Sequence, residues 1–405
     1  MALALAFSTE EIADQVGQLA KDEAVRAACA SFARWEPWLR QQQIEVSRIP
    51  APTGLEGRRA EWMRREFEHW GWQATIDEAG NAVALWPARA HAPLVAFTAH
   101  LDTAFPAGTP VEPVFQNGKL HGPGVSDNGA GLTALLALAR AAAECQWSPP
   151  PAWALIANVG EEGEGNLRGM RYFFERSPWR DRIAFTIVVD GPGCDQITVG
   201  ALGSRRVKVT FRGPGGHSWT DAGTASAIHG MGRAVAKLAA QATAQPGLEA
   251  CSVGLIEGGS TLNAIAASAA MKVDLRAAEP ARLEALTRRA RQAIEAAVEE
   301  ENRAARQGRV EADWEIIGER PWGALDAEAR LWRTVRVVDA QLGIHAQPQA
   351  ASTDANIPLS LGREALRLGA GGRGGGAHTP REWYDPLGRD IALQRLLLTG
   401  LALAD

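Results

Sequence analysis

The sequence predicts an α/β protein in which a mostly parallel sheet is interrupted by a smaller α+β domain. Three continuous apolar runs, at 94–100, 152–160 and 183–190, alternate with helical stretches, as buried parallel strands do. From about residue 203 polar and apolar residues alternate, which is typical of strands with one solvated face. The α/β pattern resumes near residue 321. We therefore expect a discontinuous domain, 1–202 with 320–405, and an inserted domain, 203–319.

The elements of the discontinuous domain follow from periodicity and from Pro and Gly breakers. Ahead of the first buried run we expect two helices and a strand pair, at 10–45, 57–70, 73–76 and 82–86. Between the buried runs we expect helices at 131–145 and 167–175. After the insert we expect a helix at 325–342, a Gly-rich loop at 369–378 and a final helix at 387–404.

The insert reads as a βαββαβ unit. Its predicted strands lie at 205–213, 252–257, 269–276 and 310–318, and its helices at 222–241 and 281–307. This order predicts a ferredoxin-like fold with one solvated sheet face.

Composition excludes several classes of protein. The 405 residues include 42 basic and 47 acidic residues, a net charge of -5, which argues against a nucleic-acid partner. No run of 18 apolar residues appears, so we expect no membrane span. The first 15 residues lack the basic region and the apolar length of a secretory signal. The four cysteines are scattered, which fits a reducing compartment, and we expect a cytoplasmic protein.

Acidic side chains and a histidine follow the three buried runs. The first run ends in His100 and Asp102, the second leads to Glu161 and Glu162, and the third ends in Asp190. Because ligands bind at the carboxyl ends of strands in open α/β sheets, these side chains should share one pocket. Burying so much negative charge without a cation is costly, so a metal centre is expected.

Two further residues fit a metal centre. Asp127 lies in a Gly-rich turn directly before the helix predicted near Gly131, and His378 follows a run of glycines. Imidazole and carboxylate ligands without a nearby thiolate suit zinc, cobalt or manganese. Each residue alone also has an ordinary explanation: Asp127 could cap a helix, and Glu161 with Glu162 could be a solvated pair at a helix N-terminus.

Taken in order, five motifs resemble metallopeptidase family 20. They are HLD (100–102), GVSDNGAG (124–131), GEEGEG (160–165), VVD (188–190) and AHTP (377–380). The family includes peptidase T, carnosinases, glutamate carboxypeptidases and aminoacylases. The resemblance covers about residue 47 to the C-terminus, and it implies a zinc-peptidase-like catalytic domain with an inserted lid and dimerisation domain.

The resemblance implies a ligand set for two divalent metal ions, zinc first, with cobalt or manganese as alternatives. His100 and Asp190 would hold one ion, Glu162 and His378 the other, and Asp127 would bridge them. At position 190 this chain has Asp, where the deacylase branch has Glu. In this respect the chain resembles the peptidase T and dipeptidase branch.

The resemblance also implies the chemistry of hydrolysis. A metal-bridging hydroxide would attack the amide carbonyl, with Glu161 as its general base. Asp102 would lie behind the imidazole of His100 and orient it.

Four further residues receive roles from the resemblance. His217, in GPGGHS (213–218), would reach across a homodimer interface and stabilise the oxyanion. Asn263 and Arg276 would bind the substrate carboxylate, and Arg373 in the Gly-rich loop would be an additional anion contact. The motif around Asn263 reads Asn-Ala-Ile-Ala, where the family has Asn-Val-Ile-Pro.

We therefore expect a dinuclear metallopeptidase that acts on di- or tripeptides. An N-acyl amino acid deacylase or a carboxypeptidase of the same family is the alternative. A non-catalytic relative that only binds peptide or metal should lack one of the metal ligands or the general base. This chain has the complete ligand set and the base. Metal-dependent phosphoryl transfer is a further alternative, but no phosphate-binding loop is present.

Overall fold

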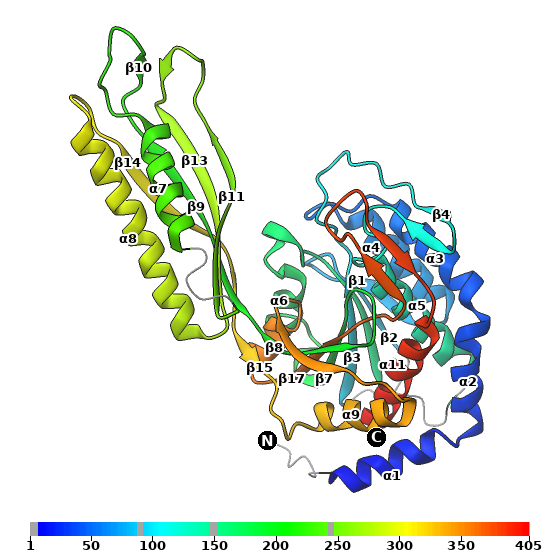
Figure 1. Cartoon of the computed structure of the whole chain (residues 1–405). Helices are drawn as coiled ribbons and strands as arrows, with labels where there is room; N and C mark the ends of the chain where they lie inside the picture. The colour runs from blue at the N-terminus through cyan, green and yellow to red at the C-terminus, as the bar shows by residue number, and fades with distance from the viewer. Residues whose placement is uncertain (1–6, 87–91, 146, 148–151, 242–246, 405) are drawn as a thin grey trace. The chain divides into compact units, whose positions relative to one another are not determined.

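A computed structural model of the chain describes residues 7–86, 92–145, 147, 152–241 and 247–404. The chain forms two compact units, Met1–Ala201 with Gly323–Asp405, and Leu202–Trp322. Each unit has its own hydrophobic core, and Figure 1 shows the helices and strands of which each is built. Among the described helices, none is long and apolar enough to cross a membrane. The segment 1–6, part of the N-terminus where we expected no secretory signal, lies outside the described residues.

A mixed sheet forms the centre of the discontinuous unit. Its path runs β1-β2-β6-β3-β7-β17-β8-β15, and β16 pairs with β8. The central strands β6, β3, β7 and β17 are parallel, and β1, β2 and β15 pair antiparallel. The strand bounds are β1 (Gln73–Ile76), β2 (Ala82–Leu85), β3 (Leu94–His100), β6 (Trp153–Asn158), β7 (Ile183–Val189), β8 (Gln196–Ala201), β15 (Gly323–Ala324), β16 (Gln347–Ala351) and β17 (Glu364–Leu368).

Helices cover both faces of this sheet, which explains why β3 is buried along its whole length. On one face Phe97 and Trp153 pack among residues of α5 (Gly129–Cys145), α9 (Arg330–Leu342) and α11 (Arg389–Leu403). On the other face Ala96 and Ile156 pack against α6 (Arg168–Glu175) and α10 (Asn356–Ser360). Alternate residues of one strand thus enter different cores, and a continuous apolar run results.

The prediction of one continuous helix at 10–45 is wrong. The structure has three helices there, α1 (Thr9–Leu19), α2 (Glu23–Arg34) and α3 (Glu36–Arg48). The side chain of Asp22 accepts a hydrogen bond from the backbone N–H of Val25 and begins α2. Pro37 lies in the first turn of α3, where its missing N–H costs nothing. The next helix, α4 (Gly57–His69), has nearly the predicted bounds.

A small antiparallel sheet joins two distant parts of the chain. Its strands pair in the order β18-β19-β5-β4, and no strand was predicted for any of them. Trp383 in β19 pairs with His121 in β5, so the segment around His378 lies beside the segment that leads into Asp127. The bounds are β4 (Val114–Gln116), β5 (Lys119–His121), β18 (Arg373–Gly375) and β19 (Trp383–Asp385). Two short 3-10 helices, η1 (Gly163–Gly165) and η2 (Arg180–Arg182), complete this unit.

The inserted unit has the predicted βαββαβ order and the strand order β11-β13-β9-β14 of a ferredoxin-like sheet. All three strand pairings are antiparallel. Val207, Val209 and Phe211 alternate with more exposed residues along β9, as predicted. The bounds are β9 (Gly203–Arg212), α7 (Ala227–Gln241), β11 (Glu249–Gly258), β13 (Ser268–Ala277), α8 (Pro280–Ala304) and β14 (Glu311–Arg320), with a separate pair of short strands, β10 (Gly216–His217) and β12 (Ala264–Ile265).

The packing around two helix glycines of the discontinuous unit predicts opposite changes in stability when each is replaced by Ala. A Cβ at Gly400 in α11 would lie 2.5 Å from Phe97 Cζ and 3.0 Å from Trp153 Cζ2, whereas a Cβ at Gly17 in α1 meets nothing within 4 Å. We expect Gly400→Ala to lower the free energy of unfolding by about 1–3 kcal/mol through overpacking. The matched Gly17→Ala change should raise it by about 0.5–1 kcal/mol.

Urea denaturation of the two variants measures both changes. Equal effects of the two substitutions on the midpoint would contradict the packing described around Gly400.

Candidate metal centre

Three neighbouring parallel strands deliver the candidate ligands to one edge of the sheet. His100 is the last residue of β3, and Asp190 directly follows β7. Glu161 and Glu162 follow β6 after a short turn. Since β3 lies between β6 and β7, the carboxyl ends of these strands meet, as the sequence predicted.

The carboxylate of Asp127 lies between two imidazoles. Its Oδ1 is 3.0 Å from His100 Nε2, and its Oδ2 is 3.2 Å from His378 Nε2. His100 belongs to β3, and His378 lies in the loop between β18 and β19. The carboxylate of Asp127 therefore links the strand end to this loop.

Each imidazole has a second carboxylate neighbour. His100 Nε2 is 3.8 Å from Asp190 Oδ1, and His378 Nε2 is 3.0 Å from Glu162 Oε1. The five side chains therefore form two sets, one containing His100 and Asp190 and the other containing His378 and Glu162. Both sets share Asp127.

These contacts change the pKa values of the groups that make them. Burial alone would lower the pKa of His100, but contacts with Asp102, Asp127 and Asp190 hold it well above the ordinary value. Hydrogen bonds to Asp127 and Glu162 raise the pKa of the His378 imidazole to about 10, although partial burial opposes them. Burial acts to raise the pKa of Asp127, and the two imidazoles outweigh it and lower that pKa.

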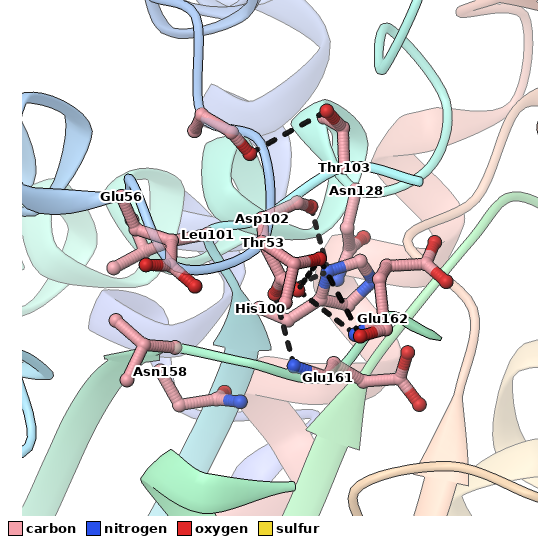
Figure 2. Close-up of polar contacts among 12 residues, drawn as sticks. Thr53, Glu56, His100, Leu101, Asp102, Thr103, Asn128, Asn158, Glu161 and Glu162 are labelled. Atoms are coloured by element: carbon pink, nitrogen blue, oxygen red, sulfur yellow. Dashed lines mark hydrogen bonds and ion pairs between the residues drawn. The ribbon is translucent and has the colours of Figure 1, made fainter. Parts of the chain in front are cut away.

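Asp102 connects His100 to the turn that carries Glu161 and Glu162. Its Oδ1 lies 3.6 Å from His100 Nδ1 and accepts a hydrogen bond from the backbone N–H of Glu161 at 3.0 Å. Its Oδ2 accepts hydrogen bonds from the N–H of Glu162 at 2.9 Å and from the hydroxyl of Thr53 at 2.8 Å. Figure 2 shows Asp102 behind His100, with the side chains of Glu161 and Glu162 projecting away from it.

Several supporting residues were missed by sequence reasoning. Asn128 is fully buried and donates to the carbonyl of Val189 at 2.9 Å, which ties the Asp127 turn to the end of β7. Asp354 is also fully buried, and its Oδ2 accepts a hydrogen bond from Asn158 Nδ2 at 2.7 Å. Burial raises the pKa of Asp354 to about 7. The Asp-Asn-Gly turn carried a signal for Asn128, whereas Asp354 lies in no predicted element.

The geometry of the cluster fits divalent metal ions. His100, Asp127 and Glu162 each present a ligand atom, and these atoms all lie within 4.8 Å of one another. Two ligands of a tetrahedral ion with bonds of about 2.0–2.1 Å are about 3.3 Å apart. The donor spacings within the two sets, 3.0–3.8 Å, bracket that value. Imidazole and carboxylate donors also match the preferences of zinc, cobalt and manganese.

Arg373 lies in the same unit but outside this cluster. It is exposed in β18 and lines an open cavity of about 690 Å³ together with Cys194, Asp195 and His345. The neighbouring Gly374 is pressed against the Asp127 turn, because a Cβ there would lie 2.4 Å from Ser126 Oγ. The substrate-binding role of Arg373 remains a prediction.

The inserted unit holds the other three predicted residues, at two places. His217 pairs with Ala264 across β10 and β12, and the carbonyl of Asn263 accepts a hydrogen bond from Ser218 N–H, so His217 and Asn263 are neighbours. Arg276 lies near the far end of β13, eight residues after Ser268, or about 26 Å along the strand. There its Nε donates to Asp274 Oδ2 at 2.7 Å. The structure therefore does not bring Arg276 to Asn263 within one unit.

Comparison with known proteins identifies the family. Residues 96–396 match the family described as Peptidase family M20/M25/M40. The chain belongs to this family. The resemblance of the five motifs to this family is thereby confirmed.

Curated relatives match parts of the chain. A LysW-lysine hydrolase from Deinococcus radiodurans is 31% identical over 184 residues, which cover 44% of this chain and 46% of that protein. A protein from Pyrococcus furiosus, described as a putative LysW-lysine/LysW-ornithine hydrolase, is 29% identical over 163 residues, 40% of this chain and 44% of that protein. The chain thus aligns with less than half the length of these relatives.

Solved structures share the fold over nearly the whole chain. A tripeptidase from Staphylococcus aureus superimposes with a TM-score of 0.72 and 20% identity, covering 91% of this chain and 98% of that one. A di-peptidase from Saccharomyces cerevisiae gives a TM-score of 0.75 with 13% identity, covering 94% and 98%. These solved structures therefore share the fold of this chain, an α/β unit with a ferredoxin-like insert.

The raised pKa of His378 predicts proton release on metal binding. With its pKa raised to about 10, the imidazole keeps its proton at pH 8, and a metal ligand must lose it. Calorimetric titration of metal-free protein with zinc at pH 8, in two buffers of different ionisation enthalpy, should detect this release. The His378→Asn variant should release about one proton fewer per chain. Identical proton release by the two proteins would show that His378 is not a protonated ligand.

Proposed function

We propose that the chain is a dinuclear metal-dependent hydrolase that cleaves amide bonds in small peptides. The observation that carries this proposal is the shared carboxylate of Asp127, whose two oxygens face the imidazoles of His100 and His378. A carboxylate that contacts two separate ligand sets suits a pair of ions better than a single ion. His100 with Asp190 would hold one ion, and His378 with Glu162 the other.

Two ions bound there, zinc or else cobalt or manganese, would polarise the substrate carbonyl and lower the pKa of a water molecule. Glu161 is the general base in this proposal: its carboxylate takes the proton from the attacking water and returns it to the leaving amine. Its backbone N–H is fixed by Asp102, which holds the start of the side chain next to the ligand Glu162. The backbone carbonyl of Asp102, 3.0 Å from His100 Nδ1, and its carboxylate, 3.6 Å away, together keep the ring of His100 in one orientation, with Nε2 toward Asp127.

The proposed substrates are di- and tripeptides. The structures that share the fold include enzymes named as a tripeptidase and a di-peptidase, and the curated relatives are named as hydrolases of LysW-linked lysine. Asp190 in place of Glu supports the peptidase assignment. An N-acyl amino acid deacylase or carboxypeptidase remains the alternative, and a paired panel of dipeptides and acetyl amino acids separates them.

We propose that two copies of the chain form a homodimer through the inserted unit. Arg276 lies about 26 Å along β13 from Ser268, the end of the strand that follows Asn263 in sequence, so one substrate carboxylate that contacted both Asn263 and Arg276 would need groups from two chains. His217 Nδ1 accepts a hydrogen bond from Trp219 N–H at 3.1 Å. Its Nε2 therefore carries the ring proton of the neutral imidazole and is suited to donate to an oxyanion.

The cysteines support a cytoplasmic location in this proposal. All four lie in the described part of the chain, and all four are free thiols. Burial raises the pKa of three of them, Cys29, Cys194 and Cys251, to about 11, so they remain protonated and unreactive at neutral pH.

The proposal predicts the effect of Glu161→Gln. Because the amide cannot take a proton, we expect kcat to fall about 100- to 10,000-fold. Metal stoichiometry should be unchanged, because Glu161 is not among the proposed ligands. The measurement is peptide hydrolysis by zinc-loaded enzyme, paired with elemental analysis of each variant.

Glu164→Gln is the matched control, since Glu164 lies three residues along and is exposed. It should hydrolyse peptides at the wild-type rate. Full activity of Glu161→Gln would remove Glu161 from the mechanism, and loss of metal from that variant would make it a ligand instead.

A further inference from the structure

Glu382 binds the turn that carries Asp127, although it lies 255 residues later in the sequence. Its side chain is fully buried. Oε2 accepts a hydrogen bond from the backbone N–H of Gly124 at 2.7 Å, and Oε1 accepts from the N–H groups of Ser126 and Asp127 at 2.8 Å each. One carboxylate thus accepts hydrogen bonds from three N–H groups of the turn, including that of Asp127 itself.

The turn has little freedom apart from this attachment. Gly124 has a φ of +74°, and a Cβ there would lie 2.7 Å from Thr103 Cγ2. A Cβ at Gly129 would lie 2.7 Å from the carbonyl oxygen of Gly124, so the two ends of the turn are in close contact. The hydrogen bonds to Glu382 therefore act together with the bond from Asn128 to Val189 in fixing the position of the turn.

Glu382 also belongs to the segment that carries His378. The N–H of Glu382 donates to the carbonyl of Thr379 at 3.1 Å, and the hydroxyl of Thr379 donates to the carbonyl of Gly376 at 2.7 Å. These bonds close a compact turn around His378. The carbonyl of Glu382 in addition accepts from the N–H of Gly122 at 3.0 Å. Both the backbone and the side chain of Glu382 therefore bind the segment 122–127.

His378 depends on such support because its own ring is poorly enclosed. Its side chain is 56% exposed, and its described polar contacts are those with Asp127 and Glu162. Without a packed environment, the ring is placed by the backbone that carries it. That backbone is held to the Asp127 turn through Glu382.

Burial acts against the charge of Glu382 and raises the pKa of its carboxyl. The N–H groups of Asp127, Gly124 and Ser126 oppose that shift, because they bind the ionised, hydrogen-bond-accepting form. Arg59 is also fully buried, and it donates to the carbonyls of Ile49 and Leu101. Burial lowers the pKa of its guanidinium to about 10, and the charges of Asp102 and Glu382 oppose this shift.

We propose that Glu382 is a positioning residue that sets the distance between Asp127 and His378, and thereby the affinity of the site for metal. This inference rests on the proposed function, since it assumes that these two side chains are ligands. It assigns Glu382 no contact with substrate. Partners that orient metal ligands in this way typically change metal affinity about 10- to 100-fold when they are replaced.

The test compares Glu382→Gln with wild type and with a matched control. The amide has the shape of the carboxylate, but its NH₂ group would face at least one backbone N–H, so one hydrogen bond becomes a repulsion. Glu364→Gln is the control: Glu364 Oε2 accepts one hydrogen bond, from the N–H of Leu331 at 2.7 Å at the start of α9. Zinc affinity is measured by competition with a chromophoric chelator, and thermal unfolding is recorded without metal.

We expect Glu382→Gln to bind zinc about 10- to 100-fold more weakly than wild type, with Glu364→Gln at the wild-type affinity. Hydrogen exchange in metal-free Glu382→Gln should also be faster at the amides of Gly124, Ser126 and Asp127. Wild-type affinity and wild-type exchange in folded Glu382→Gln would overturn the proposal. An equal loss of affinity in both variants would reduce Glu382 to a general stabilising residue.

The outcome separates this inference from the proposed function. If wild-type protein binds no zinc, the proposed function fails, whatever Glu382 does. If wild type binds zinc and Glu382→Gln binds it equally well, only the positioning role fails. If Glu382→Gln does not fold, Glu382→Asp replaces it: that variant keeps the charge but is one methylene shorter, and unchanged zinc affinity would again overturn the proposal.

Discussion

The carboxylate of Asp127 contacts two imidazoles that lie far apart in the sequence, and this arrangement constrains the structure around it. His100 must end a buried strand beside Glu162 and Asp190. The loop with His378 must return to the same edge of the sheet after the chain has formed the inserted unit. In metal-free protein the two imidazoles supply the positive charge that the carboxylates require. In the proposed enzyme two metal ions supply it, and the same contacts become ligand bonds.

Support for the cluster comes mainly from groups that bind backbone. The carboxylate of Asp102 accepts hydrogen bonds from the N–H groups of Glu161 and Glu162. The carboxylate of Glu382 accepts hydrogen bonds from N–H groups of the Asp127 turn. Arg59 is a buried cation whose charge is attracted by both carboxylates. Because a backbone N–H has a direction as well as a position, such contacts fix a whole turn rather than one side chain. This arrangement keeps the candidate ligands in place through the backbone of the turns that carry them.

The sequence predicted the strands that carry His100, Glu162 and Asp190, because burial on both sheet faces leaves continuous apolar runs. It did not predict β16, whose residues Gln347–Ala351 are largely polar or small and mostly exposed. The ligand candidates followed from acids and histidines at strand ends and from the resemblance to a family. Glu382 and Arg59 could not be found that way, since a hydrogen bond to a distant backbone N–H or carbonyl leaves no spacing or periodicity in the sequence.

In the proposed centre Asp127 bridges two metal ions. X-ray absorption and anomalous diffraction on zinc-loaded protein would locate these ions rather than infer them from activity. We expect two ions per chain about 3.5–4 Å apart, with one oxygen of Asp127 on each. A single ion per chain, or two ions without Asp127 between them, would contradict it.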